Sequence, residues 1–150
     1  MNIKGAMRQQ RSTLSVRTTG PGLTEITREL LGLVADSGIR EGLATIFCHH
    51  TSASLVIQEN ADPDVCRDLQ TFFERIAPWD PALYRHGSEG PDDMPAHIRA
   101  ALTQTSLSIP IAAGTLDLGT WQGVYLFEHR KRPHVRRVTL HLMGEGGERP

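Results

Sequence analysis

The irregular order of strand-like and helix-like segments is the feature that most constrains how this chain can fold. Strand-like alternation appears near both ends and in the middle, and helix-like spacing of apolar residues interrupts it at unequal intervals. The strand-like segments are residues 10–18, 43–49, 54–58, 107–118, 119–128 and 138–142, and the helix-like segments are residues 23–34, 63–77 and 93–102. This order favours an α+β fold over a doubly wound parallel sheet. We expect a mainly antiparallel β-sandwich with about three helices.

The length of the chain predicts one domain. A chain of 150 residues buries enough surface to fold without a metal or disulfide staple, so we expect a single domain over residues 1–150. The ordered core is expected at about residues 13–145, with frayed termini that include the tail from Gly144. A hydrophobic content of 39% with 22% charged residues excludes wholesale disorder. The net charge of −1 argues against a nucleic-acid-binding domain, which would be basic.

The cysteine content and the hydropathy of the chain indicate the cellular compartment in which the protein is expected. Cys48 and Cys66 form no CxxC pair, so they make neither a disulfide framework nor a cysteine-based zinc site. Free thiols fit a reducing compartment. The first residues carry no apolar core of signal-peptide length, and no apolar run is long enough for a membrane span. We therefore expect a soluble, cytoplasmic protein without a membrane partner.

Local signals define two helices and a long polar connection between them. Asp62 followed by Pro63 predicts an N-cap, and Asp93 is expected to cap the third helix. The buried stripe of the helix after Asp62 is expected to consist of Val65, Leu69, Phe72, Phe73 and Ile76. Residues 77–92 are polar and rich in Gly and Pro, and a connection of this length is usually functional or disordered.

Three histidines are candidates for a metal site. His50 ends a strand-like run, His86 lies in the long polar connection, and His97 lies one turn into a predicted helix. Three neutral imidazoles that converge from separate elements, with an open position, would suit catalytic zinc or a related divalent ion. The spacing itself is not diagnostic, because the chain has no HxxxH or HExxH. Separate surface or hydrogen-bonded imidazoles are the alternative.

Carboxylates and a basic run complete the candidate chemistry. Glu59 and Asp92 can bind Mg²⁺ or transfer protons, whereas Asp62 and Asp93 are explained as N-caps. Arg130 and Arg136 carry forked guanidinium groups that suit phosphate, and the Ser52 hydroxyl can assist them. The alternatives are a solvated hairpin turn for the basic run and an ion pair between Glu128 and one of these arginines.

Several motifs together resemble a known family. They are His50-Thr-Ser-Ala-Ser-Leu55, Glu59-Asn60 with Asp62-Pro63, Asp92-Asp-Met-Pro-Ala-His-Ile98, Gly119-Thr-Trp-Gln-Gly123 and Glu128-His-Arg130. In this order they resemble the YjbQ-type proteins, also called the secondary thiamine-phosphate synthase family. The resemblance implies an α+β fold with a β-sandwich, and a homotrimer with sites near the subunit boundaries.

The same resemblance implies an activity on small phosphorylated metabolites. The expected reaction is that of a transferase, which joins a pyrimidine diphosphate to a thiazole phosphate and releases pyrophosphate. We expect His50, His97, Glu59 and Asp92 in catalysis, Arg130, Arg136 and Ser52 at phosphate, and His50, His86 and His97 on a divalent ion, zinc or magnesium. The alternatives are a non-catalytic metal- or metabolite-binding trimer with incidental synthase activity, and a metal-dependent hydrolase.

Overall fold

Two antiparallel sheets share one hydrophobic core, which confirms the predicted α+β class. The computed structural model describes residues 5–147. The larger sheet has the order β1 (Met7–Arg17), β8 (Val135–Gly146), β3 (Ile39–Cys48), β5 (Ser106–Ala112) and β6 (Thr115–Leu116). The smaller sheet has the order β2 (Gly22–Glu25), β7 (Gln122–Glu128) and β4 (Ala53–Glu59). Every strand pair in both sheets is antiparallel.

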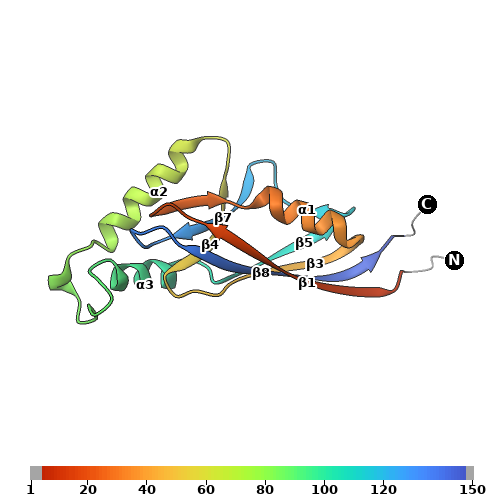
Figure 1. Cartoon of the computed structure of the whole chain (residues 1–150). Coiled ribbons are helices and arrows are strands. Elements are labelled where there is room, and N and C mark those ends of the chain that lie inside the picture. Colours follow the sequence, from red (N-terminus) through yellow and green to blue (C-terminus); the bar gives the residue numbers. More distant parts are fainter. Residues whose placement is uncertain (1–4, 148–150) are drawn as a thin grey trace.

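Within residues 5–147, three α-helices accompany the sheets at opposite ends of the molecule. Helix α1 (Thr27–Ser37) packs its buried Leu30 and Val34 into the common core. Helices α2 (Pro63–Ile76) and α3 (Asp93–Leu102) lie together at the end farthest from the start of β1 and the last residues of β8 (Figure 1). Within residues 5–147, no helix is long and apolar enough to cross a membrane.

Two of the differences from the sequence prediction arise because strand pairing overrides local spacing. Residues 22–25 were expected to open a helix at Leu23, but they form β2, which pairs with the end of β7. The tail was expected to fray from Gly144, but β8 continues to Gly146 in register with β1 and β3. The expected fraying of the outermost residues, 1–4 and 148–150, lies outside the described part of the chain.

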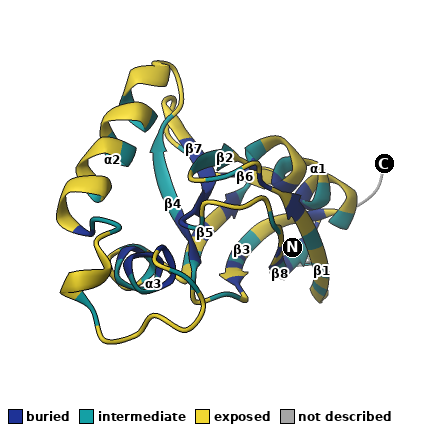
Figure 2. Ribbon diagram, turned by 60° about the vertical axis from the view of Figure 1, so that its left-hand side comes forward, coloured by how far each residue is buried: buried dark blue, intermediate teal, exposed yellow. Residues whose placement is uncertain are grey.

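Helix α2 begins as predicted but packs less tightly than predicted. The Asp62 side chain caps it by accepting a hydrogen bond from the Asp64 N–H at 2.9 Å. The expected buried stripe is wrong, because none of the residues of α2 is buried and Phe72 and Ile76 are 54% and 44% exposed. Phe73 makes an edge contact with Phe127 at 5.3 Å between ring centroids. Figure 2 shows α2 as a mostly exposed helix beside the sheets.

Helix α3 and the turn between β7 and β8 bring distant segments to one place. The connection from α2 to α3 contains one 3-10 turn, η1 (Pro81–Leu83), and then leads to His86. Hydrogen bonds from Arg130, after β7, reach Asp92 and Asp93 at the start of α3. The segment between β3 and β4 contacts α3 through the carbonyl of Thr51. Candidate residues from four parts of the sequence therefore meet at this end of the molecule.

Candidate functional site

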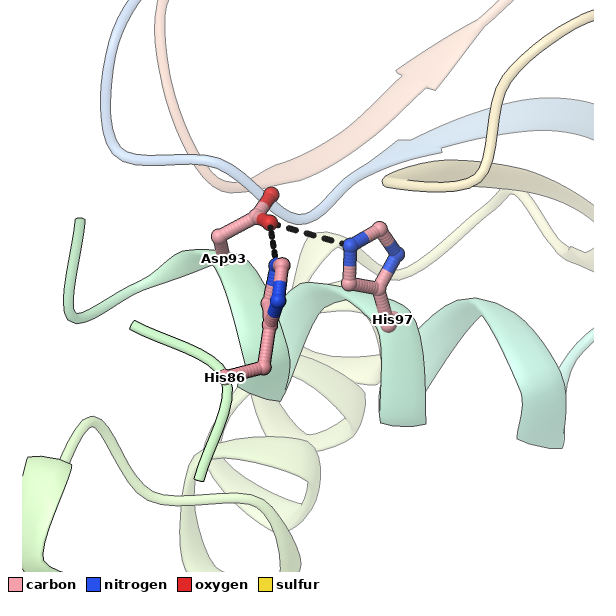
Figure 3. A group of neighbouring side chains, drawn as sticks. All are labelled: His86, Asp93 and His97. Carbon is pink, nitrogen blue, oxygen red and sulfur yellow. Dashed lines mark hydrogen bonds and ion pairs between the residues drawn. The ribbon is translucent and has the colours of Figure 1, made fainter. Parts of the chain in front are cut away.

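Asp93 is the centre of a cluster with two histidines, which we name the α3 cluster: His86, Asp93 and His97. The Nε2 atoms of His86 and His97 lie 2.7 and 3.0 Å from the same oxygen, Oδ2 of Asp93 (Figure 3). The α-helical spacing of four residues places Asp93 and His97 on one face of α3, and the polar connection brings His86 to them. The Asp93 carboxylate is almost completely buried, whereas both imidazoles are partly exposed.

The other nitrogen of His97 determines what its Nε2 can do. Nδ1 of His97 lies 2.9 Å from the carbonyl oxygen of Thr51 and donates its hydrogen to it, because a carbonyl only accepts. In a neutral ring Nε2 then carries a lone pair, and this lone pair faces the Asp93 carboxylate. Two acceptors at 3.0 Å require a proton or a metal cation between them. An Nδ1–H bound to a backbone carbonyl is also the usual orientation of a metal-binding histidine.

The donor set of the α3 cluster fits a divalent cation. One ligand atom from each of the three residues lies within 4.8 Å of the other two. Ligand atoms around tetrahedral zinc lie about 3.3 Å apart, so small side-chain movements would close the set. Two imidazoles and one carboxylate leave a fourth position for water or substrate, which is the pattern of a catalytic zinc site.

Arg130 holds the second oxygen of Asp93. Its Nη1 donates to Oδ1 of Asp93 at 2.7 Å, and its Nε donates to Oδ2 of Asp92 at 3.0 Å. Burial would raise the pKa of Asp93, but the hydrogen bond from His86 and the charges of His97 and Arg130 outweigh burial and lower that pKa. Asp93 was predicted as an N-cap, and this is wrong: it is the first residue of α3 and its carboxylate binds the histidines and Arg130. Asp92 occupies the cap position without a side-chain capping bond.

His50 stands outside the α3 cluster. Its Nε2 accepts a hydrogen bond of 2.8 Å from the backbone N–H of Arg137, so the hydrogen of its neutral ring is on Nδ1. Burial and the charge of Arg136 lower the pKa of His50, which keeps the ring neutral. The three predicted histidine ligands therefore become two histidines and an aspartate, because the nitrogen of His50 with a lone pair is already used.

Arg136 and Ser52 belong to a second group of polar residues, on the core face of the larger sheet. We name the buried residues Glu128, His129 and Arg136 the β7–β8 cluster. Arg136 pairs with Glu128 through Nε at 2.8 Å and through Nη2, and Nη2 also donates to Oγ of Ser52 at 3.0 Å. Hydrogen bonds from Arg136 and Thr18 outweigh the effect of burial and lower the pKa of Glu128. The structure places the Arg136 guanidinium in the interior, bound to protein groups.

Glu59 lies far from both clusters. It is the last residue of β4, and Ala53, the first residue of that strand, lies next to the segment that contacts α3. Six residues of extended chain span about 20 Å. The Glu59 carboxylate accepts the N–H of Asp62 at 3.2 Å, just before α2. The structure does not bring Glu59 together with His50, His97 and Asp92.

A cavity of about 320 Å³ opens beside the α3 cluster. It is lined by Glu89, Gly90, Pro91, Asp92, Arg130, Lys131 and Arg132. Lys131 and Arg132 are exposed, and the Lys131 ammonium lies 4.2 Å from the centre of the Trp79 ring. Arg130 connects this cavity to the α3 cluster, because the same guanidinium that lines the cavity binds Asp93. Lys131 and Arg132 were part of the predicted basic run, but neither was singled out as a site residue.

Known proteins match this chain over nearly its whole length. Residues 12–145 match the family model described as UPF0047 protein YjbQ-like. UPF0047 protein sll1880 from Synechocystis is 55% identical over 92% of this chain and 94% of its own length. UPF0047 protein YjbQ from Escherichia coli O157:H7 is 43% identical over 91% of this chain and 98% of its own length.

Solved structures confirm the fold that this match implies. A YbjQ-like protein from Sulfolobus solfataricus superposes with a TM-score of 0.85 at 25% identity, over 93% of this chain and 100% of the other. A conserved protein of the YjbQ/UPF0047 family from Clostridium acetobutylicum gives a TM-score of 0.80 at 38% identity, over 87% and 98%. The chain therefore belongs to the UPF0047 family of YjbQ-like proteins.

Proposed function

We propose that this protein is a metal-dependent transferase for small phosphorylated metabolites, which joins a pyrimidine diphosphate to a thiazole phosphate and releases pyrophosphate. The observation that carries the metal-dependent part is that Nε2 of His97 and Nε2 of His86 converge on one oxygen of Asp93, while Nδ1 of His97 is held by the Thr51 carbonyl. A cation between this oxygen and the two nitrogens would be bound by all three atoms. The thiamine-phosphate-synthase reaction itself comes from the resemblance of the motifs to the YjbQ-type family.

The residues of the α3 cluster favour zinc over magnesium. Magnesium prefers oxygen ligands in octahedral geometry, whereas zinc takes imidazole and carboxylate ligands together. In the proposed site His86, Asp93 and His97 hold the ion, and a bound divalent ion supplies positive charge for the departing pyrophosphate. Arg130 fixes the Asp93 carboxylate from its other oxygen, 2.7 Å from Nη1.

Phosphate recognition is assigned to the cavity of about 320 Å³ beside Asp92 and Arg130. The exposed cations Lys131 and Arg132 supply the charge, because Arg130 is engaged by Asp92 and Asp93 and Arg136 by Glu128. His50 is proposed as a neutral donor that presents Nδ1–H toward solvent or substrate. This proposal keeps the predicted phosphorylated substrate and moves its binding to different cations of the same basic run.

The proposed assembly is a cytoplasmic homotrimer, as the family resemblance implies. The outer face of the larger sheet supports contact with further copies of the chain, since Leu43, Phe47 and Met143 are exposed there. Apolar side chains of this size gather on surfaces that proteins use for association. Light scattering of the native protein should give about three times the chain mass of 16.6 kDa, and a mass equal to one chain would contradict the trimer.

Metal analysis combined with a synthase assay tests the proposed function. Purified protein should contain about one zinc per chain, and His97→Ala should lose both the metal and the release of pyrophosphate while remaining folded. Asp36→Ala is the control, because Asp36 is exposed near the end of α1, away from the α3 cluster, and should keep both. Metal uptake without turnover would overturn the transferase and favour a metal-binding trimer. Hydrolysis of the pyrimidine diphosphate without joining would favour the hydrolase.

A further inference from the structure

The carboxylate of Glu128 is a buried point at which several hydrogen bonds converge. It is fully buried at the end of β7 and accepts hydrogen bonds from the side chains of Arg136 and Thr18, at 2.8 Å (Nε) and 2.7 Å. It also accepts the backbone N–H groups of His129 and Arg130, at 3.0 and 3.2 Å. A buried ion pair by itself contributes little net stability compared with apolar packing. We therefore look for a role of the Glu128–Arg136 pair other than stability. Hydrogen bonds lead from this pair to the α3 cluster along two routes.

The first route runs from Glu128 through Arg136 to His97. Arg136 Nη2 donates to both the carbonyl oxygen and the hydroxyl of Ser52, at 3.2 and 3.0 Å. The peptide plane of the Thr51 carbonyl ends at Cα of Ser52. Arg136 holds the carbonyl and the hydroxyl attached to the other side of this Cα, which restricts the movement of the Thr51 carbonyl, the group that accepts Nδ1–H of His97.

The second route runs from Glu128 through Arg130 to Asp93. The backbone N–H of Arg130 donates to Glu128 Oε2 at 3.2 Å, which fixes the start of the turn after β7. The guanidinium of the same residue holds Oδ1 of Asp93 at 2.7 Å. One buried carboxylate is thus connected to two of the three residues in the α3 cluster.

We propose that Glu128 and Arg136 are positioning residues for the α3 cluster, which hold the Thr51 carbonyl against Nδ1–H of His97 and orient the Asp93 carboxylate. This inference rests on the proposed metal-binding role of that cluster. It assigns Arg136 to the interior of the site instead of to the phosphate of a substrate. A carbonyl oxygen only accepts, so a fixed carbonyl keeps a hydrogen on Nδ1 and directs Nε2 toward Asp93.

The test measures the hydrogen on His97 Nδ1 directly in the metal-free protein. Nitrogen-15 NMR of labelled histidine detects whether Nδ1 carries a hydrogen that is held against exchange with water. The His97→Gln variant identifies the His97 signals. Arg136→Lys retains the charge but loses the fork that reaches Glu128 and Ser52 together, and Ser52→Ala is the milder variant, which removes one acceptor. Arg17→Lys, on the neighbouring strand and exposed, is the matched control.

We expect a protected hydrogen on Nδ1 of His97 in the wild type and in Arg17→Lys, and its faster exchange with water in both Arg136→Lys and Ser52→Ala. The Kd for Zn²⁺, measured by calorimetry, should rise about 10- to 100-fold in Arg136→Lys and less in Ser52→Ala, with unchanged circular dichroism. A wild-type Nδ1 signal and a wild-type Kd in folded Ser52→Ala and Arg136→Lys would overturn the inference. If the wild type binds no Zn²⁺, the proposed function fails, and the Nδ1 measurement still decides the positioning role.

Discussion

The α3 cluster and the β7–β8 cluster contain the same kinds of side chain but differ in their exposure and in what surrounds the central carboxylate. In the β7–β8 cluster, donors surround the Glu128 carboxylate, and the cluster is closed from solvent. In the α3 cluster, Arg130 holds one oxygen of Asp93, and two partly exposed imidazole nitrogens share the other. That shared oxygen leaves room for a cation between it and the imidazoles, whereas Arg136 already binds both oxygens of Glu128. This difference separates a candidate site from the scaffold that holds it.

The largest expected effect comes from neutralising the carboxylate of the buried cluster. Glu128→Gln leaves the Arg136 guanidinium buried without its charge partner, so the free energy of unfolding should fall by about 3 kcal/mol. The isosteric change Asp93→Asn should cost clearly less, because His86 and His97 are partly exposed and can turn to water. Urea denaturation of both metal-free variants measures this, and equal losses of stability would erase the distinction between the two clusters.

The second expected effect is on metal binding, which should depend on Asp93 and not on His50. Asp93→Asn should raise the Kd for Zn²⁺ at least about 100-fold, because it removes a charged ligand from the set. His50→Gln should bind Zn²⁺ nearly as the wild type does, because His50 Nε2 is bound to the backbone of β8 and a glutamine oxygen can replace that acceptor. A loss of binding in His50→Gln equal to that in Asp93→Asn would restore the three-histidine site predicted from the sequence.

Asp93 and Arg136 show how much of the site could be predicted from the sequence alone. The spacing of Asp93 and His97 by four residues places them on one helical face, so their pairing could be predicted. The alternation of Val138, Leu140 and Leu142 along β8 likewise predicts burial at Arg136, which lies on the same face. The basic character of residues 130–137 favoured a phosphate site instead, and on that reading Arg136 was expected to meet substrate.

Other features of the site depend on contacts that no local pattern contains. The hydrogen bond from the Arg137 backbone to His50, and the one from His97 to Thr51, join segments that are 87 and 46 residues apart. The capping signal at Asp62 was local and is confirmed, whereas the similar signal at Asp93 is overridden by Arg130 and two histidines. The α+β class was predictable because strand and helix periodicities are local and numerous.

The third expected effect is a loss of stability below neutral pH that originates in the buried cluster. Burial, together with the charge of Arg99, lowers the pKa of His129 to about 3, against an ordinary value of about 6.5 in the unfolded chain. Between these two pH values the His129 imidazole carries a proton in the unfolded chain but not in the folded protein, so stability falls as the pH drops. By pH 5 the loss from this one residue is about 2 kcal/mol.

The variant His129→Leu isolates that contribution. It removes the hydrogen bond to Ser54, so it lowers stability at neutral pH, but it should flatten the decline in stability between pH 7 and 5 by about 2 kcal/mol. Glu128 and Asp92 have lowered pKa values, so both carboxylates stay ionised in this range and the stability that they contribute is lost only at more acid pH. An unchanged slope in His129→Leu would show that His129 accepts a proton in the folded protein.

The smallest expected effect separates the stabilising contacts of Glu128 from those that lead to the α3 cluster. Thr18→Val removes one hydroxyl donor from Glu128, at 2.7 Å, while the bonds from Arg136 and from the Arg130 backbone remain. The free energy of unfolding should fall by about 1 kcal/mol. The Kd for Zn²⁺ should stay within about twofold of the wild type, because neither route to His97 or Asp93 passes through Thr18. If thermal denaturation shows the loss and calorimetry shows an equally weakened metal site, then metal affinity follows general stability, and no separate role in positioning the ligands is left for Glu128 and Arg136.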